Sequence, residues 1–191
     1  MPPPPETFTL DRIPSPVGEL LVASDAEARL RILDFGDYDE RMRQLLRRRY
    51  GPDGVEMTQG RAPASIREPI EAYFAGELEA LDAIPVKTAG TPFQLEVWAA
   101  LRTIPAGSTQ SYGGLAAQIG RPNAMRAVGL ANGSNPIAIV VPCHRVIGAD
   151  ATLTGYGGGI DRKRWLLAHE GVKVADTPAP RGRQLELGLA S

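Results

Sequence analysis

The stretch VPCHRV, residues 141–146, places a thiol directly beside an imidazole. Cys143 is the only cysteine in 191 residues, which excludes an internal disulfide and a zinc site made of several cysteines. A thiol reacts as its thiolate, and the neighbouring His144 is the candidate base that would take its proton, directly or through a water. The pair predicts a nucleophilic cysteine, with a buried and inert thiol as the alternative.

A base of this kind needs a third group that orients it, and a carboxylate is available near the end of the chain. The segment DRKRWLLAHEG predicts a helix over residues 161–170 that is closed by Gly171, with Glu170 in its last turn. A carboxylate there opposes the helix dipole, a small cost that can mark a functional position. Glu170 is therefore the candidate partner of His144, with an ordinary surface charge as the alternative. His169 is interpreted as a solvated helix residue.

Two segments must position this chemistry. The β-branched run from Ile137 to Val141 predicts a buried strand, which Pro142 ends because proline has no N–H for the next ladder bond. Cys143 is then expected where a rigid strand breaks into a turn. Further along, glycines surround Tyr156 in TGYGGG, so the backbone could approach a flat ligand while Tyr156 forms a wall. The segment matches no phosphate-binding glycine motif, and a plain flexible loop is the alternative.

Three helices are predicted ahead of the cysteine. The segment TPFQLEVWAALRTIPAG, residues 91–107, predicts the first, which Thr91 caps and Pro105 stops. Ser111 can cap a second helix that ends at Gly120, and Pro122 can open a third after a tight turn. Two short helices around a glycine-containing turn are typical of a helix-turn-helix, although many helical hairpins look similar.

The third of these helices has an unusual surface. Ala124, Ala127, Gly129 and Ala131 are small, and Arg126 is its one long cationic side chain. Small side chains let a helix approach another body closely. Close packing inside the protein is the alternative.

The first half of the chain predicts a scaffold. Residues 18–24 and 29–35 have the alternation of strands, and residues 38–51 and 65–78 have the apolar spacing of helices. Together they indicate a small α/β domain over residues 6–86, in which no segment resembles a site.

Composition and charge narrow the function classes. Apolar residues make up 43% and charged residues 23%, which is ordinary for a globular protein. Residues 1–90 carry 11 Lys/Arg and 16 Asp/Glu, whereas residues 91–171 carry 7 and 4, so the second half is the one that could face phosphate. The N-terminus lacks the features of a signal peptide, and no apolar run could span a membrane. We therefore expect a cytoplasmic protein with no membrane contact.

Three segments, residues 111–129, 135–148 and 154–171, closely resemble the O6-alkylguanine-DNA alkyltransferases, or methylated-DNA–protein-cysteine methyltransferases. The similarity runs from about residue 91 to 171, and PCHRV after an Asn-Pro pair is its most specific part. It implies an α/β fold, with a small N-terminal α/β domain that has a short antiparallel sheet and a winged helix-turn-helix-like C-terminal domain that carries the cysteine. The expected divisions are a disordered start at 1–5, the scaffold at 6–86, the DNA-binding alkyltransferase domain at 87–172 and a flexible tail at 173–191.

The resemblance implies DNA repair by direct, irreversible transfer of the alkyl group from O6-alkylguanine, and also from O4-alkylthymine, to Cys143. The nucleotide would be flipped out of the duplex, and the stable thioether would limit each molecule to one reaction. The implied partner is double-stranded DNA that contains the lesion, and we expect a monomer without a cofactor. Relatives can hold zinc through Cys and His in the N-terminal domain, but both His of this chain follow residue 140, so we predict no metal.

The same resemblance implies roles for the residues of the reacting centre. Cys143 would accept the alkyl group, and His144 would take its proton through a water. Glu170 would orient His144, and Asn135 would brace the turn that presents the thiol.

Other positions are implied to meet the DNA or the base. The second helix of the helix-turn-helix, with Ala127 and Gly129, would lie in the minor groove. Arg126 would fill the gap left by the flipped nucleotide, and Tyr112 would assist flipping and bond the purine edge. The base pocket would be formed by backbone of Cys143 and Val146, together with Tyr156 and Gly157. Some relatives have Ser where Gly157 stands, so a roomier pocket for bulkier alkyl groups is a further hypothesis.

The end of the chain carries a separate signal. The segment QLELGL resembles the hexapeptide with which bacterial repair proteins dock on the sliding clamp, and Gln184, Leu185, Leu187 and Leu189 would be its contacts. A helix packed on the domain is the alternative.

Three other functions remain to be separated from alkyl transfer. An alkyltransferase-like protein would bind alkylated DNA without reacting, but Cys143 argues against it. A winged-helix transcription factor would need a basic, base-reading helix. A cysteine hydrolase with Cys143, His144 and Glu170 would turn over without DNA.

Overall fold

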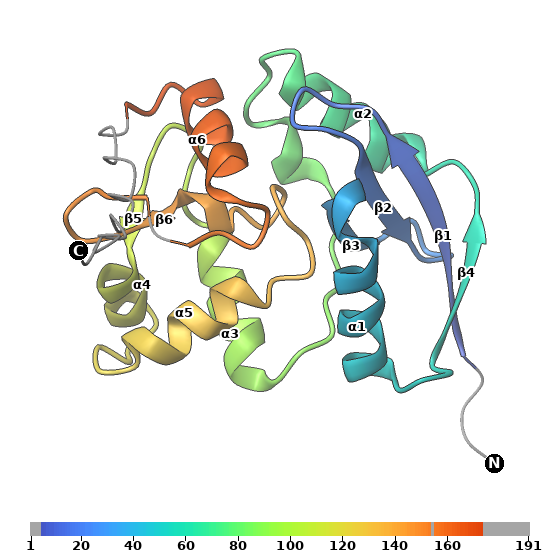
Figure 1. Cartoon of the computed structure of the whole chain (residues 1–191), viewed down its shortest axis with the longest axis horizontal. Coiled ribbons are helices and arrows are strands. Elements are labelled where there is room, and N and C mark those ends of the chain that lie inside the picture. The colour runs from blue at the N-terminus through green and yellow to red at the C-terminus, as the bar shows by residue number, and fades with distance from the viewer. Residues whose placement is uncertain (1–4, 154, 174–191) are drawn as a thin grey trace, which may run out of the picture.

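The computed structural model describes residues 5–153 and 155–173. Its first half is a four-stranded sheet with two helices (Figure 1). The strands are β1 (Glu6–Ile13), β2 (Leu20–Ser24), β3 (Leu30–Phe35) and β4 (Val55–Gln59), in the order β3-β2-β1-β4. The pairs β1–β2 and β2–β3 are antiparallel, as expected, whereas β4 runs parallel to β1 at the edge.

The sheet is covered on both faces, which explains why all five residues of β2 are buried. On one face, Leu21 and Ala23 pack with Met42 and Leu46 of α1 (Asp39–Tyr50). On the other face, the alternate side chains join a larger apolar cluster that includes α2 (Ala64–Phe74) and much of the second half. The two halves therefore share one continuous core.

The predicted elements of the first half are confirmed, with one shortened helix. The strands predicted over 18–24 and 29–35 are β2 and β3, and α1 ends at Tyr50, directly before Gly51, whose φ is +85°. The helix predicted over 65–78 ends at Phe74, because Gly76 takes a φ of +110° that does not continue a helix.

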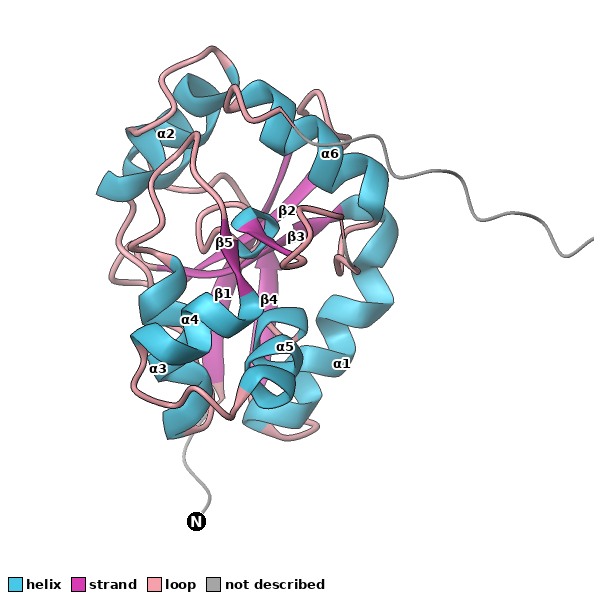
Figure 2. Ribbon diagram, turned by 90° about the vertical axis from the view of Figure 1, so that its left-hand side faces the viewer, coloured by secondary structure: helices cyan, strands magenta, loops and turns pink. Residues whose placement is uncertain are grey.

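The second half is built from helices around a short parallel ladder. These elements are α3 (Pro92–Leu101), β5 (Gln110–Ser111), α4 (Tyr112–Gln118), α5 (Met125–Gly133), β6 (Val146–Ile147) and α6 (Ile160–His169), with 3-10 turns at Gly36–Tyr38, Ala80–Ala83 and Cys143–Arg145. The caps predicted at Thr91 and Ser111 are confirmed, since their side-chain oxygens accept hydrogen bonds from the backbone N–H groups three residues on. Figure 2 shows α4 and α5 next to each other beside the β5 ladder.

Pro122 does not open the second helix of this pair, and that prediction is wrong. The N–H of Ala124 donates to the carbonyl of Arg121 at 2.8 Å, so Pro122 occupies the second position of a turn, where its fixed φ is favoured. Helix α5 begins only at Met125.

The strand predicted over Ile137–Val141 is also wrong, although every residue of this run is buried. Only Ile137 pairs with the sheet, through an isolated parallel bridge to Leu33 of β3. The chain then turns, with Ile139 at a φ of +68° and the Val141 N–H donating to the Ile137 carbonyl at 3.0 Å. An apolar β-branched run indicates that the segment is buried, but it does not show that the backbone forms a strand. Here the run is buried between the two halves of the molecule.

Candidate active site

Cys143 opens the 3-10 turn Cys143–Arg145 directly after this buried loop. The residue is only 6% exposed. Burial raises the pKa of the thiol, while the hydrogen bond from Asn135 and the nearby cations Lys163 and Arg41 act in the opposite direction. The thiol is therefore held protonated at neutral pH, and a base must remove its proton before it can act as a nucleophile.

Asn135 ties the loop and the thiol together. Its side-chain nitrogen donates to the carbonyl of Val141 at 2.8 Å and lies 3.1 Å from Cys143 Sγ. Its side-chain oxygen accepts from the N–H of Ile137 at 3.0 Å. One amide thus fixes both ends of the turn and points a donor at the sulfur.

His144 and Glu170 are in contact, as the sequence predicted. His144 is fully buried, and its Nε2 lies 2.9 Å from Glu170 Oε1. Because a carboxylate only accepts hydrogen bonds, this contact places the imidazole proton on Nε2. The other ring nitrogen, Nδ1, is buried without a hydrogen-bond partner among the described residues, so it is the basic lone pair. Burial lowers the pKa of His144, against the opposing effect of Glu170.

Glu170 receives more donors than the sequence indicated. Burial alone would raise its pKa, but hydrogen bonds and charge from His144 and Arg145 lower the pKa to about 2. Arg145 Nε donates to Oε2 at 3.0 Å, and its NH2 donates to Oε1 at 2.9 Å. The hydroxyl of Tyr73, on α2 of the first half, donates to Oε1 at 2.9 Å. The carboxylate therefore stays ionised.

The sequence reasoning missed Tyr73 and Arg145. Arg145 is part of the VPCHRV stretch. Once Glu170 is predicted to be buried beside His144, a cation such as Arg145 is expected to pair with its charge. Tyr73 gave no signal, since an aromatic residue on an apolar helix face reads as core. Its contact shows that the first half supplies part of the site's hydrogen-bond network.

Lys163 is a third group that was missed. It is fully buried on α6, and its Nζ donates to the carbonyl of Val146 at 2.6 Å. Burial lowers its pKa to about 8. Lys163 thus holds the backbone of Val146, which was expected to face a base, from the protein side.

Tyr156 and Gly157 lie beside α1 and β3. The Tyr156 ring packs edge-on against Phe35 with centroids 6.4 Å apart, and its buried hydroxyl has no hydrogen-bond partner among the described residues. A Cβ at Gly157 would lie 2.6 Å from the Arg41 guanidinium. The space expected at Gly157 is therefore occupied here by the end of a flexible side chain from the first half.

The exposed face of α5 carries two of the residues that were predicted to contact DNA, Arg126 and Ala127. Arg126 and Ala127 are exposed, and Arg126 makes no hydrogen bond or ion pair with any residue that the structure describes. Gly129 faces the Tyr112 ring, at 3.8 Å from the position of a Cβ. Leu130 is 77% exposed. The small residues of this helix thus have two roles: Gly129 allows close contact with α4, and Ala127 lies on an exposed surface.

His169 is not the solvated residue that the sequence suggested. Its ring stacks on Trp165 with centroids 4.9 Å apart, and its Nε2 lies 2.8 Å from the carbonyl of Tyr73. This contact joins α6 to α2 and so supports the Tyr73–Glu170 hydrogen bond.

Two wider features complete the description. Within residues 5–153 and 155–173 no cluster of three His, Cys, Asp or Glu side chains could hold a metal ion, and none of the helices there is long and apolar enough to cross a membrane. Gln184, Leu185, Leu187 and Leu189 lie outside the described residues.

Comparison with known proteins agrees across the chain. Residues 11–88 match the family model of the 6-O-methylguanine DNA methyltransferase ribonuclease-like domain, and residues 92–172 match that of the DNA binding domain. The methylated-DNA–protein-cysteine methyltransferase of Shigella flexneri is 53% identical over 161 residues, which are 84% of this chain and 94% of that protein.

Solved structures give the same result. The O6-methylguanine methyltransferase of Mycobacterium tuberculosis is 45% identical, with a TM-score of 0.68 over 86% of this chain and 92% of that one. A structure of Mycobacterium tuberculosis OGT in complex with DNA has a TM-score of 0.69 at 44% identity, over 86% and 92% of the two chains. With two family models and a relative at this identity and coverage, the chain belongs to the 6-O-methylguanine DNA methyltransferase family.

Proposed function

We propose that this protein repairs DNA by moving the alkyl group of O6-alkylguanine, and of O4-alkylthymine, irreversibly onto Cys143. The observation that carries the proposal is the buried chain of contacts from Asn135 to Cys143 and from His144 to Glu170, set beside a helix-turn-helix. An inert buried thiol needs neither an oriented imidazole nor an ionised carboxylate.

The chemistry follows from the hydrogen positions. With its proton held on Nε2 by Glu170, His144 can accept the thiol proton of Cys143 at Nδ1, directly or through a water. The resulting imidazolium is stabilised by the Glu170 carboxylate, which does not itself need to take up a proton. The proton that Nδ1 takes from the thiol does not have to be released to solvent, because it can pass on to the guanine.

The thiolate then displaces guanine from the alkyl carbon. The S–C bond forms as the C–O6 bond breaks, and the departing guanine takes up the proton that the thiol lost. The Asn135 amide donates to the sulfur before this step. Since a thioether cannot be cleaved by the groups around it, each molecule acts once.

The target carbon is hidden inside a duplex, so the nucleotide must be flipped out. We assign α5 to the minor groove, with Ala127 and Gly129 on the helix that enters it, Arg126 filling the gap and Tyr112 beside the purine. The base would lie against the backbone of Cys143 and Val146 and against Tyr156 and Gly157. Arg41 would have to move aside to admit it, because Cys143 is nearly covered.

The first test is the intact mass of the protein after mixing with excess duplex that contains one O6-methylguanine. We expect a single methyl-for-hydrogen gain that maps to Cys143 and stops at one per chain, with Cys143→Ser as the control that gains none. Unchanged mass with tight retention of the lesion duplex would favour a non-reacting binding protein. Unchanged mass without binding would leave a hydrolase or an inactive protein.

The pocket proposal has its own test. If the pocket can hold a larger alkyl group at Gly157 once Arg41 moves, the rates for benzyl and butyl adducts, each divided by the rate for the methyl adduct, should be higher in the wild type than in Gly157→Ser. Equal relative rates in the two proteins would remove the idea of a roomier pocket.

We further propose that the protein works in the cytoplasm as a monomer. We also propose that the end of the chain docks on a bacterial sliding clamp through Gln184, Leu185, Leu187 and Leu189. A pull-down with purified clamp should retain the wild type and lose it when Leu187 and Leu189 are both changed to Ala. Equal retention of both proteins would contradict the clamp contact, and sedimentation would test the monomer.

A further inference from the structure

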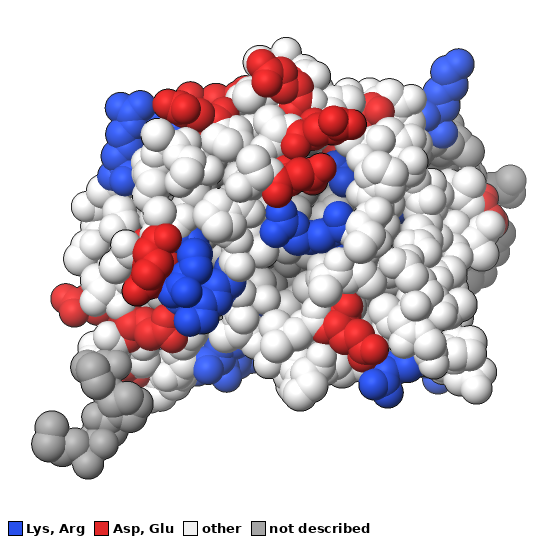
Figure 3. Space-filling view, turned by 180° about the vertical axis from the view of Figure 1, so that it is seen from behind, with Lys and Arg blue, Asp and Glu red and all other residues white. Residues whose placement is uncertain are grey.

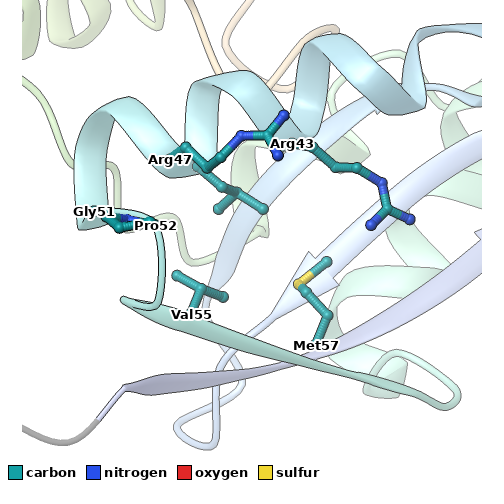
Figure 4. A pocket seen from close by; sticks show the side chains of 7 residues that line it. Arg43, Arg47, Gly51, Pro52, Val55 and Met57 are labelled. Atoms are coloured by element: carbon teal, nitrogen blue, oxygen red, sulfur yellow. The ribbon is translucent and has the colours of Figure 1, made fainter.

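Helix α1 presents two opposite rows of polar side chains, which differ in how far their charges are neutralised. On the β4 side, Arg43 pairs with Asp39 at 2.8 Å and Arg47 pairs with Glu40 at 2.8 Å. Figure 4 shows these two arginines along α1 above Val55 and Met57 of β4. Their charges are balanced by the helix that carries them.

The other row faces α5. Arg41, Gln44, Leu45 and Arg48 follow the i, i+3, i+4, i+7 spacing of one helix face and line one side of a groove of about 390 Å³. Arg48 is exposed and makes no hydrogen bond or ion pair with any described residue. Arg41, in the same row, lies 3.8 Å from the Asp34 carboxylate, so Arg48 is the arginine of α1 that is both exposed and without a charge partner among the described residues.

The opposite wall of this groove belongs to α5. It consists of Gly129, Leu130, Gly133 and Ser134, and a Cβ added at Gly133 would meet nothing within 4 Å. The groove has no acidic lining residue. Contacts from Arg41 to the Gly133 carbonyl at 3.3 Å and from Arg49 to the Ser134 carbonyl at 2.6 Å hold the two helices in this arrangement.

The groove continues the exposed face of α5. Arg126, Ala127, Leu130 and Gly133 are all exposed and recur at positions 1, 2, 5 and 8 of one face, so that face leads from Arg126 directly to the groove. A helix of this length spans about 13 Å, and a DNA minor groove is bordered by phosphates on both sides. A helix laid in that groove therefore brings its end close to a phosphate backbone.

We propose that the α1–α5 groove binds the sugar-phosphate backbone of duplex DNA, with Arg48 contacting a phosphate. The inference rests on the proposed function, since it takes α5 as the helix that meets DNA. It extends the DNA-binding surface onto the first half, whose overall charge is acidic but which places five of its eleven Lys/Arg residues on α1. On the far face of the molecule, most Lys and Arg side chains lie next to Asp or Glu (Figure 3).

The test compares neighbouring arginines on one helix. Binding of a fluorescent duplex of undamaged sequence is measured by anisotropy over a range of salt for the wild type, Arg48→Ala, Arg47→Ala and Arg126→Ala. We expect Arg48→Ala to bind about three- to tenfold more weakly at low salt and to lower the slope of log K against log salt by about 0.9, as for the loss of one phosphate contact. Arg47→Ala should stay within about twofold of the wild type, because Glu40 already neutralises it.

Several outcomes would overturn the inference. If Arg126→Ala weakens binding while Arg48→Ala matches Arg47→Ala, the groove does not bind DNA and the proposed function stands. If the wild type does not bind duplex at all, both fall together. Arg48→Lys, which keeps the charge, must recover most of the affinity, and an equal melting temperature for all variants excludes a folding defect as the cause.

Discussion

The turn at Cys143 and the surface of α5 lie close together in sequence but are built in opposite ways. Around the turn, one carboxylate of Glu170 satisfies His144, Arg145 and Tyr73, and all four side chains are buried. On α5, Met125 is 52% exposed and Leu130 is 77% exposed, and Arg126 has no partner among the described residues.

This difference separates two requirements of one reaction. A buried network keeps its tautomer and charge without rearrangement, which a proton transfer requires. A surface that binds DNA must remain accessible, so its side chains cannot already be paired within the protein before DNA binds. Changes in the network should therefore alter folding stability first, and changes on α5 should alter binding first.

The largest effect is expected for Glu170→Ala. The change leaves Arg145 as a buried cation without its carboxylate and removes a partner from His144 and Tyr73. Breaking a buried pair in this way should cost about 3–5 kcal/mol of unfolding free energy. Urea unfolding measures it, with Glu71→Ala, an exposed carboxylate paired with Arg67, as the matched control. A cost below about 1 kcal/mol, as for a surface pair, would show that the network is not a buried unit.

The next effect is a pH dependence that belongs to Lys163. Burial lowers its pKa to about 8, whereas an unfolded lysine titrates near 10.4. Between these values the unfolded state binds more protons, so stability should rise with pH, by about 2 kcal/mol from pH 8 to pH 10. Unfolding is measured from pH 8 to 10 in Cys143→Ser, so that the thiol does not contribute.

The control for this titration is Lys163→Met in the same Cys143→Ser protein. It should lose the rise between pH 8 and 10, because it removes the group that titrates. An identical rise in both proteins would assign the effect to other residues.

A smaller effect is expected for Tyr73→Phe. This change removes one hydrogen bond to Glu170 and leaves the buried ring in place, so about 1 kcal/mol of stability should be lost. Tyr38→Phe is the matched control, since its hydroxyl makes no hydrogen bond within the described part of the chain. Equal stability of the two variants would mean that the first half does not support Glu170 through this contact.

The sequence predicts the reacting centre better than its surroundings, and the reason is physical. Cys143, His144 and Glu170 are polar groups in apolar contexts, so each one stands out, and the predicted contact between His144 and Glu170 is present. Tyr73 is a core residue by pattern, and only the packing of α2 against α6 brings its hydroxyl to the carboxylate.

The fold shows the same limit. The strands β2 and β3 and the caps of α3 and α4 depend on local signals and were predicted. Residues 137–141 depend on a neighbour that is about a hundred residues away in sequence, and their burial says nothing about whether the backbone pairs beyond Ile137. The sequence predicts only a scaffold for the first half, but the first half places Arg41 over Gly157 and the Tyr73 hydroxyl at Glu170.

The smallest effect on stability is expected for Arg126→Ala, where the comparison is sharpest. Arg126 is exposed and makes no interaction with the described residues, so its loss should change unfolding free energy by less than about 0.5 kcal/mol. If Arg126 fills the gap left by the flipped nucleotide, as proposed, transfer from a duplex lesion should nevertheless slow about tenfold in the variant. Single-turnover mass spectrometry measures the rate, with Arg164→Ala, a half-buried arginine paired with Asp161 on α6, as the control. If Arg126→Ala instead destabilised the fold and left transfer intact, α5 would be a packing element, and the division between a satisfied site and an open binding surface would not hold.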